Sequence, residues 1–416
     1  MTTPDQPTPA PGSGRAHRQL AIFGELLRSL LPAARRETNF PAYLQHRLGR
    51  DKRFGSRDRR IYRALAYAAV RHLPWIEAAP ASLQPDLALW LAGDEPTLAS
   101  LRAELLAGWP ALPATPAEQA ALLAARLGQP VTVDQLFPDW LTAEAPELTG
   151  VARDLLLTRS PLWLRLQTSD PAAVDTWLGR EGIPFRHHPL LPDARALLVE
   201  ADVARSPLHD AGAFEIQDLG SQLILAIAAP APGTRWLDAC AGAGGKTLQL
   251  ARILGPAGHV DATDIRPAAL AELRTRAARA GLANVATLPA PPAADRLYDG
   301  VLVDAPCSGS GTWRRSPHLR WQTAAADLRR QHERQLAILT QHAAHVRPGG
   351  RLVYATCSLA RTENEGTVAA FLAAHPDFRV APPADSFGCT VGELGTAILP
   401  HVHDTDAFFV SVLERR

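Results

Sequence analysis

Apolar residues recur at helical spacing through the first third of the chain. Ile22, Leu26 and Leu30 fall on one helical face, and the stretch from Ile61 to Ala69 repeats that spacing. Runs of β-branched residues are scarce there, and prolines separate the apolar stretches. The pattern predicts an all-helical domain over residues 15–145, preceded by a short disordered tail at 1–14.

The pattern changes between residues 146 and 230. Short apolar runs at 163–166 and 196–200 are typical of strands, and residues 172–182 carry helical spacing between them. This alternation predicts a small α+β module.

From residue 231 to the end, strands and helices alternate more regularly. Strands are expected at 235–239, 260–264, 300–304 and 351–355, with helices at 246–254, 267–280 and 323–346. Such alternation is typical of a parallel, doubly wound sheet. The predicted fold class is therefore α/β, with a Rossmann-like domain over residues 231–416.

Length and composition agree with several soluble domains. The 416 residues exceed one ordinary core, and 46% are hydrophobic while 20% are charged. No apolar run is long enough for a membrane span, and the N-terminus does not resemble a secretory signal. Four cysteines are too few for a disulfide framework. We expect a cytoplasmic monomer with reduced thiols, no membrane contact and no metal ion.

Basic residues gather between Arg47 and Arg63, where eight stand against two acidic ones. The cluster suits phosphate binding, and it equally suits a solvated helix face. Along the whole chain arginine dominates so strongly that lysine occurs only at Lys52 and Lys246. Because lysine and arginine are not interchangeable in a tight site, the lysine retained at position 246 supports a role for that residue.

A glycine-rich loop follows the first strand of the Rossmann-like domain, at residues 237–247 (LDACAGAGGKT). Glycines allow close approach of a ligand, and the following helix offers free N–H groups. A phosphate-binding P-loop would need glycine at Cys240, so that interpretation fails. The next strand ends at Asp264, which suits a ribose diol or a helix N-cap ahead of Pro267.

Two cysteines stand at predicted strand ends, in Asp304-Ala305-Pro306-Cys307 and in Thr356-Cys357-Ser358. In an open α/β sheet the ligand crevice lies outside the carboxyl ends of the strands. A lone cysteine is usually a small buried apolar residue. Two of them at adjacent strand ends, together with Asp304, instead indicate a reactive site.

These motifs resemble those of the bacterial ribosomal RNA 5-methylcytosine methyltransferases of the RsmB (Fmu/Sun) type. The glycine loop, DAPCSGxGxxRRxP, ATCS and ENE stand in the family's order, and the resemblance runs from about Leu155 to the end. Upstream, residues 55–60 and 66–71 look similar to the family's NusB-like helical domain. The sequence departs from the family at Gly242-Ala243, where the family has Ala-Pro. It also lacks an acid over residues 288–292, where the family contacts the adenine.

The resemblance implies a reaction and a role for each residue. Cys357 would attack cytosine C6, Cys307 would assist release, Asp304 would hold the base, and Lys246 would orient Asp304. The cofactor would be S-adenosylmethionine, bound by Cys240, Ala241, Gly242, Ala243, Gly244, Gly245, Lys246, Asp264 and Asp304, although Cys240 is expected to be structural.

The resemblance also implies an RNA partner, with residues 15–145 and 146–230 as RNA-binding parts. Ribosomal RNA, most of all that of the small subunit, is the expected substrate. The RNA contacts are expected at Arg57, Arg59, Arg60, Arg314 and Arg315.

Three alternatives remain open from the sequence. Transfer RNA is a second candidate substrate. A non-catalytic RNA-binding assembly factor would explain the missing adenine acid. An amino-group methyltransferase is the third, but its chemistry favours Asp/Asn-Pro-Pro-Tyr where this chain has Asp304-Ala305-Pro306-Cys307.

Overall fold

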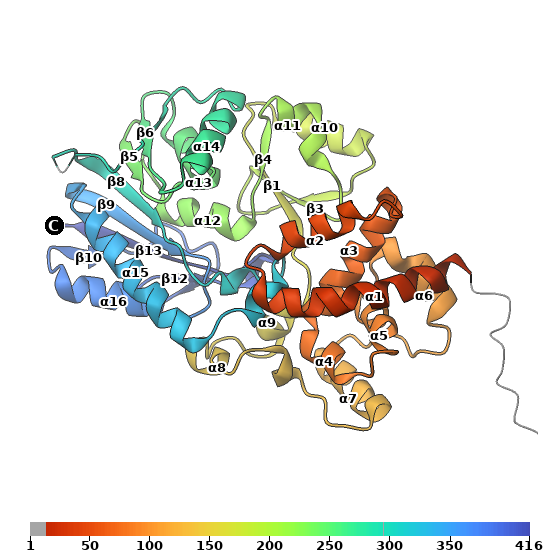
Figure 1. Cartoon of the computed structure of the whole chain (residues 1–416). Helices are drawn as coiled ribbons and strands as arrows, with labels where there is room; N and C mark the ends of the chain where they lie inside the picture. Colours follow the sequence, from red (N-terminus) through yellow and green to blue (C-terminus); the bar gives the residue numbers. More distant parts are fainter. Residues whose placement is uncertain (1–13, 294) are drawn as a thin grey trace, which may run out of the picture. The chain divides into compact units, whose positions relative to one another are not determined.

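Residues 14–293 and 295–416 are described by a computed structural model, and Figure 1 labels most of its helices and strands. The tail predicted at residues 1–14 lies, apart from Gly14, outside the described residues. The chain divides into two units. The helical unit comprises the residues up to Asp139 together with Pro317–Gln322, and the α/β unit comprises Trp140–Ser316 and Thr323–Arg416.

The described residues of the helical unit form helices and no strand, as predicted. Its helices are α1 (Arg15–Arg36), α2 (Phe40–Arg50), α3 (Ser56–Arg71), α4 (Leu73–Ala78), α5 (Gln84–Leu91), α6 (Ala99–Leu105) and α7 (Pro116–Leu127). Phe23 of α1 and Leu65 of α3 are fully buried on the faces that the apolar spacing predicts. The segment Pro317–Gln322 comes late in the chain but belongs to this unit. Its Trp321 packs there, and the indole N–H donates to the Val70 carbonyl oxygen at 2.7 Å.

The α/β unit begins with α8 (Leu141–Glu144) and α9 (Gly150–Asp154), followed by a small antiparallel sheet in the order β2-β3-β1-β4. Its elements are β1 (Leu162–Leu166), α10 (Pro171–Arg180), β2 (Phe185–His187), β3 (Ala194–Leu197), α11 (Pro207–Asp210) and β4 (Phe214–Ile216). The predicted strands at 163–166 and 196–200 are present, although the second begins and ends earlier. β2 and β4 have three residues each, too few for a periodic pattern.

The larger sheet has the order β11-β12-β13-β9-β8-β5-β6-β7, and β10 pairs with β13. The strands are β5 (Arg235–Asp238), β6 (His259–Ala262), β7 (Val285–Thr287), β8 (Tyr298–Asp304), β9 (Val346–Thr356), β10 (Phe378–Val380), β11 (Thr390–Val391), β12 (Thr396–Ile398) and β13 (Phe408–Arg415). β5 to β9 are parallel; β5, β6, β8 and β9 were predicted, whereas the three-residue strand β7 was not. The antiparallel edge formed by β10 to β13 was not predicted.

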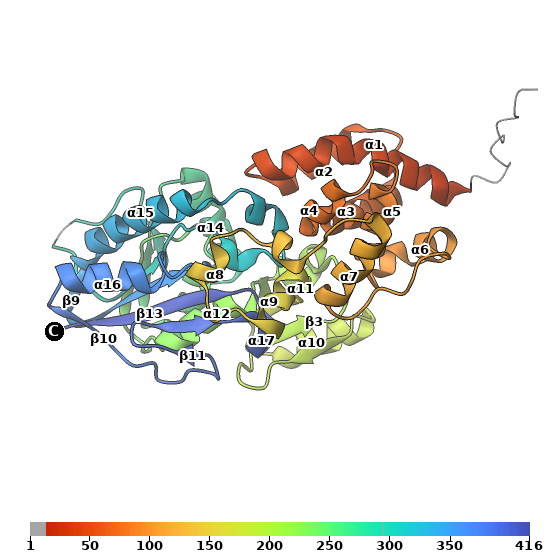
Figure 2. The same ribbon diagram turned by 90° about the horizontal axis from the view of Figure 1, so that it is seen from below.

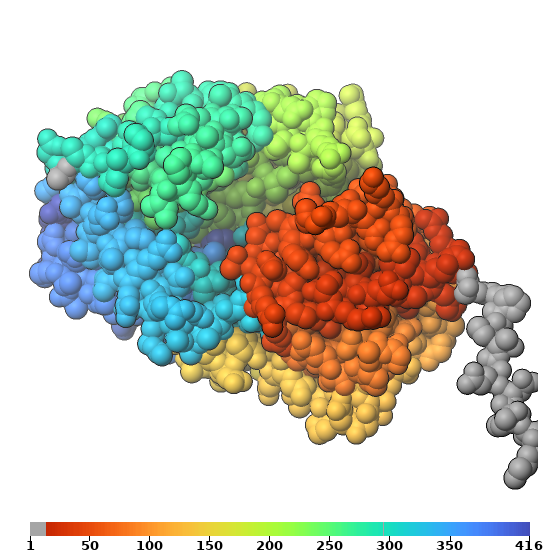
Figure 3. All heavy atoms as spheres, in the orientation of Figure 1, coloured from red at the N-terminus to blue at the C-terminus, as the bar shows by residue number. Residues whose placement is uncertain are grey.

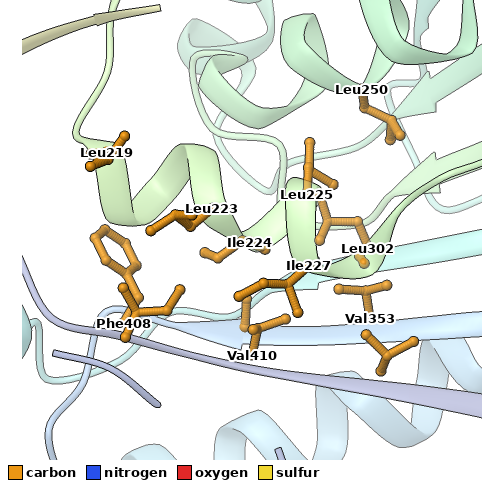
Figure 4. Close-up of a cluster of buried hydrophobic side chains, with 14 of the residues drawn as sticks. Leu219, Leu223, Ile224, Leu225, Ile227, Leu250, Leu302, Val353, Phe408 and Val410 are labelled. Atoms are coloured by element: carbon orange, nitrogen blue, oxygen red, sulfur yellow. The ribbon is translucent and has the colours of Figure 1, made fainter. Parts of the chain in front are cut away.

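Helices cover both faces of the larger sheet (Figures 1 and 2). They are α12 (Leu219–Ala228), α13 (Gly245–Leu254), α14 (Pro267–Arg279), α15 (Ala325–Ala343) and α16 (Glu365–Ala374), and α17 (Pro400–His403) precedes β13. Because side chains alternate along a strand, Leu302 packs toward α12 and α13, while Val301 and Val303 pack toward α15 and α16. Figure 4 shows the apolar side chains of α12 against Val353 and Val410. α15 also forms part of the surface in Figure 3.

The parallel strands place the chemistry at one edge. Asp238 at the end of β5 pairs with Ala262 of β6 and Leu302 of β8, and Asp304 of β8 pairs with Ala355 of β9. The loops that follow these strands therefore meet. Among the described residues, no helix is long and apolar enough to cross a membrane.

Candidate active site

The two cysteines predicted to meet are in contact. The register of β8 and β9 sets Asp304 beside Ala355, so the loops that follow lie side by side. The sulfur atoms of Cys307 and Cys357 are 3.4 Å apart, within hydrogen-bond distance for thiols. Gly311 N–H donates to the Cys357 carbonyl oxygen at 2.9 Å and fastens the two loops together.

The surroundings of the two sulfurs separate their acidities. The hydrogen bond with Cys357, together with burial, raises the pKa of Cys307 well above the usual thiol value. The hydrogen bond from Cys307 lowers the pKa of Cys357, against the opposing effects of burial and the Asp304 carboxylate, with help from the cations Arg315 and Lys246. Of the two thiols, Cys357 is therefore the one whose ionisation is favoured.

Asp304 is held by Lys246. The Lys246 Nζ donates to Asp304 Oδ2 at 2.7 Å, which confirms the predicted contact between them. Lys246 is buried in the first turn of α13, with its ammonium 5.5 Å from the centre of the Phe408 ring. The Asp304 side chain stays 32% exposed, so its free oxygen can accept a further hydrogen bond. The catalytic roles of both residues stay predictions.

The glycine loop turns sharply between β5 and α13. Gly242 has φ +54° and Gly244 φ +93°, and Gly244 N–H donates to the Ala241 carbonyl oxygen at 2.9 Å. A Cβ at Gly244 would lie 2.8 Å from Leu273 Cγ, so this position also requires glycine for space. A Cβ at Gly245 would meet nothing within 4 Å, which leaves the N-terminal end of α13 open on that side.

Asp264 is turned back toward the glycine loop. Its carboxylate accepts hydrogen bonds from Gly242 N–H at 2.8 Å and from the Arg266 backbone and guanidinium at 2.8–3.0 Å. Burial would raise the pKa of Asp264, but these hydrogen bonds outweigh it and lower the pKa. The alternative helix N-cap is not found, because α14 is capped by Arg266 without a side-chain hydrogen bond.

The loop residues fit an adenosine cofactor with a cationic amino group. Asp238 Oδ2 accepts from Thr247 Oγ1 at 2.7 Å, while its buried Oδ1 has no hydrogen-bond partner. Burial raises the pKa of Asp238 to about 7. The unpartnered Asp238 Oδ1 suits an ammonium. The open side of Gly245 leaves space for a close ligand, and the Asp264 carboxylate suits a ribose diol. Burial raises the pKa of Cys240 to about 12, so this thiol stays neutral, in keeping with a structural residue.

Two arginines that sequence analysis missed support the glycine loop from outside it. Arg276 of α14 donates to the Ala243 carbonyl oxygen at 2.7 Å, and Arg165 of β1 donates to the Gly245 carbonyl oxygen at 3.4 Å. Arg165 also donates to Gln217 Oε1 at 2.5 Å, although burial lowers the pKa of Arg165 to about 9. A lone arginine inside an apolar strand was the available signal.

A buried carboxylate lies beneath the two cysteine loops. Glu363 accepts hydrogen bonds from Ser308 N–H and Oγ at 2.8 and 2.5 Å, from Ser358 Oγ at 2.5 Å and from Gln335 Nε2 at 3.0 Å. Beside it, Asn364 donates to the Ser358 carbonyl oxygen at 3.0 Å. The ENE motif pointed to this position, but the sequence alone did not assign it a role.

The predicted phosphate contact is wrong for Arg314. This arginine is 1% exposed, and its guanidinium donates to the Thr405 carbonyl oxygen at 3.0 Å and to Asp404 Oδ1 at 2.8 Å, which makes it structural. The Arg315 side chain is 52% exposed, with its Nε 2.7 Å from the buried Asp406 carboxylate. A phosphate contact at Arg315 stays a prediction.

The basic residues predicted to bind RNA lie in the first turns of α3 in the helical unit. Arg57 and Arg60 are exposed and Arg59 is half-buried. Their positions suit either a phosphate contact or a solvated face, so the RNA role stays a prediction.

The order of strands in the larger sheet and the glycine loop after β5 define the α/β unit as a Rossmann-like fold, of the class that binds adenosine-containing cofactors. Residues 225–414 match the family model described as 16S rRNA methyltransferase RsmB/F. A ribosomal RNA small subunit methyltransferase B of Xylella fastidiosa (strain 9a5c) is 33% identical over 400 residues, covering 86% of this chain and 92% of the relative. The chain belongs to the RsmB/F methyltransferase family, as the motifs predicted.

Solved structures share the fold. The crystal structure of PH0851 gives a TM-score of 0.71 at 20% identity, covering 94% of this chain and 99% of that one. The structure of NSun6 from Pyrococcus horikoshii with SFG gives a TM-score of 0.60 at 19% identity, covering 67% and 98% of the two chains.

Proposed function

We propose that this enzyme methylates C5 of a cytosine in 16S ribosomal RNA through a covalent adduct between Cys357 and C6 of the base. The observation that carries the proposal is the pair of sulfurs 3.4 Å apart, of which Cys357 is the more acidic. Membership of the RsmB/F family and the names of its relatives support ribosomal RNA as the substrate.

The order of bonds follows from the chemistry of cytosine. The Cys357 thiolate forms a bond to C6, and the electron pair of the C5–C6 double bond makes C5 a carbon nucleophile. S-adenosylmethionine, when bound, supplies an electrophilic methyl group. After C5 has gained the methyl group, the C5 proton must leave so that the bond between sulfur and C6 can break. Cys307, in contact with Cys357, is placed to assist that step.

Asp304 and Lys246 would hold the base. The Asp304 oxygen that does not bond Lys246 can accept a hydrogen bond from the exocyclic amine of the base. Lys246, fixed in the first turn of α13, keeps that carboxylate beside the two sulfurs. The reactive base must leave its stack to enter this site, which costs least in single-stranded or looped RNA.

The helical unit is proposed to bind the RNA backbone as a NusB-like domain. A surface hollow of about 390 Å³ opens between α2 and α3, lined by Gln45, His46, Leu48, Gly49, Arg50, Arg59 and Arg63. Arginines that converge on one hollow suit phosphate oxygens, because each guanidinium presents several donors in a fixed plane.

A methyl-transfer assay on deproteinised RNA tests the proposal. The enzyme should label 16S ribosomal RNA and leave transfer RNA unlabelled, with the methyl group at C5 of cytosine. Mapping methylated cytosines in RNA from cells with and without the protein would identify the position. Labelling of transfer RNA alone would show that transfer RNA, and not 16S ribosomal RNA, is the substrate. Binding of RNA and cofactor without methyl transfer would favour a non-catalytic assembly factor.

A further inference from the structure

Glu363 is a fully buried side chain whose hydrogen bonds come from neutral groups. The donors are the Ser308 N–H, the Ser308 and Ser358 hydroxyls and the Gln335 amide. Removing a carboxylate from water is costly, and neutral donors offset that cost less completely than a cation would. The desolvation cost of the Glu363 carboxylate indicates that this side chain has a function.

The carboxylate connects the two loops that carry the reactive sulfurs. Ser308 follows Cys307 directly, and Ser358 follows Cys357 directly. Both hydroxyls reach the Glu363 Oε2 at 2.5 Å, so the two loops share one acceptor atom. The separation of the sulfurs therefore depends on the position of this side chain.

Glu363 holds the loop of Cys307 through backbone groups, whereas it holds the loop of Cys357 only through a side chain. Glu363 Oε1 accepts the backbone N–H of Ser308. On the Cys357 side, Glu363 Oε2 accepts only the side-chain hydroxyl of Ser358. Gln335 donates both to Glu363 Oε1 and to the Pro306 carbonyl oxygen, so it braces the residue before Cys307 as well. The negative charge beside Cys307 contributes to the raised pKa of this thiol.

We propose that Glu363 is a positioning residue for the two-cysteine reaction. It holds the sulfurs in contact and keeps the shared proton on Cys307, so that Cys357 is the sulfur that ionises. The inference rests on the proposed function for the roles of the two thiols. The ionisation of Cys307 and Cys357 can nevertheless be measured in the protein without RNA or cofactor.

Other charged groups face the sulfur pair and stay constant in the test. Asp304 and Lys246 approach Cys357 from β8 and α13, and Arg315 approaches it from the turn after β8. The buried Tyr354 hydroxyl donates to the Glu363 carbonyl oxygen at 2.6 Å, beneath the loops. None of these groups is altered by a substitution at Glu363.

The test measures the titration of each thiol without RNA or cofactor. In a Cys357→Ser background, iodoacetamide alkylation of Cys307 is followed against pH by mass spectrometry, with and without Glu363→Gln. Loss of the charge should lower the Cys307 midpoint by about one pH unit, as expected for removal of a nearby like charge. In a Cys307→Ser background the midpoint of Cys357 should move less. Glu365→Gln, two residues away and without a contact to either serine, is the matched control and should move neither midpoint.

An unchanged Cys307 midpoint in a folded Glu363→Gln protein overturns the proposal. Should that variant not fold, Glu363→Asp carries the test, since it keeps the charge but cannot reach both serines. In the Cys357→Ser background the Cys307 midpoint should stay in place with Glu363→Asp. In a Cys307→Ala background, where the covalent RNA adduct accumulates, Glu363→Asp should lower the adduct yield at least tenfold; a full adduct yield would overturn the positioning role. Because the titrations use no substrate, they decide the inference even if methyl transfer to 16S ribosomal RNA is not observed.

Discussion

Two thiols in contact cannot easily both ionise, because the second negative charge would lie beside the first. Cys307 and Cys357 are in this situation, and their neighbours decide which one carries the charge. Arg315 and Lys246 favour the thiolate on Cys357, while Glu363 disfavours it on Cys307. The surrounding charges thus favour ionisation of Cys357, as the proposed attack on C6 requires.

The two roles predict opposite failures on substitution. Cys357→Ala should form no covalent RNA adduct and transfer no methyl group, because C5 is never activated. Cys307→Ala should still add to C6 and methylate once, then remain attached to the RNA because release is blocked. Denaturing gels with labelled RNA should show a shifted band for Cys307→Ala alone.

Cys389→Ala is a suitable control for these variants, because Cys389 lies buried in the apolar core and should leave turnover intact. The reverse pattern of adducts would move the nucleophile to Cys307. Absence of an adduct from either variant would favour the non-catalytic interpretation.

The acidity of Cys357 predicts the pH dependence of the first step. Since the pKa of Cys357 is lowered, adduct formation should rise with pH, with a midpoint below that of an ordinary thiol. Arg315→Ala removes a stabilising cation, so the midpoint should move to higher pH while the rate recovers at alkaline pH. Single-turnover methyl transfer measured from pH 6 to 10 tests this, with Arg315→Lys as the control. Weaker RNA binding without a shifted midpoint would make Arg315 a phosphate contact instead.

Asp264 gives a separate test of the cofactor site. Asp264→Ala should weaken S-adenosylmethionine binding by roughly 1–3 kcal/mol, because ribose hydroxyls lose their acceptor. Arg266→Ala should not weaken binding, since the guanidinium occupies the same carboxylate oxygens that the ribose would use. Calorimetry on both variants measures the difference. If Asp264→Ala binds S-adenosylmethionine as tightly as the unaltered enzyme does, Asp264 does not contact the cofactor.

At the scale of elements, neighbouring glycines in the loop between β5 and α13 have different functions. Gly244→Ala should cost about 1–2 kcal/mol of folding free energy, because its φ of +93° suits glycine and its Cβ would press on Leu273. Gly245→Ala should fold normally, since its Cβ position is open. It should nevertheless bind S-adenosylmethionine more weakly, because the methyl group fills the space the ligand needs. Chemical denaturation and calorimetry separate the two effects, and a Gly245→Ala variant with full affinity would contradict this placement.

The sequence predicted the elements whose signals are local. Alternating strands and helices predicted the parallel part of the larger sheet, and residue types at strand ends predicted that Cys307 and Cys357 would meet. The short strands β2 and β4 were missed, because three residues carry no measurable period. The antiparallel edge around β13 depends on pairing between distant segments, which no local pattern encodes.

Side-chain roles that depend on burial were the hardest to predict. Arg314 and Arg315 are neighbours in sequence, yet the first is a buried structural residue and the second is exposed. Arg165 supports the glycine loop from a strand 80 positions away in the sequence. Glu363 acts on two loops at once. Each of these roles needs at least one partner far along the chain, so it follows from the tertiary structure.

At the scale of the whole molecule, the proposed function assigns different tasks to the two units. The α/β unit contains the glycine loop, Asp304 and both sulfurs, and so has the groups needed for the chemistry. The helical unit has a cluster of basic residues around α2 and α3. Contacts with the RNA backbone supply affinity but do not distinguish one base from another, whereas contacts in the active site can select the base. Binding of RNA and of cofactor should therefore be separable by substitution.

Charge reversal on the helical unit tests that separation. Arg57→Glu with Arg60→Glu should weaken binding of 16S ribosomal RNA and reduce the slope of affinity against salt, because fewer counterions are released. Arg59 stays unaltered in this test, since its Nε is buried and a carboxylate there would endanger the fold. Arg18→Glu with Arg28→Glu changes the charge of the same unit equally, on exposed positions of α1, and should reduce affinity much less. Calorimetric affinity for S-adenosylmethionine should stay constant in both pairs, because the cofactor residues lie in the other unit. Equal losses of RNA affinity in the two pairs would mean that net charge matters and position does not, and no loss in either would leave the basic cluster as a solvated helix face.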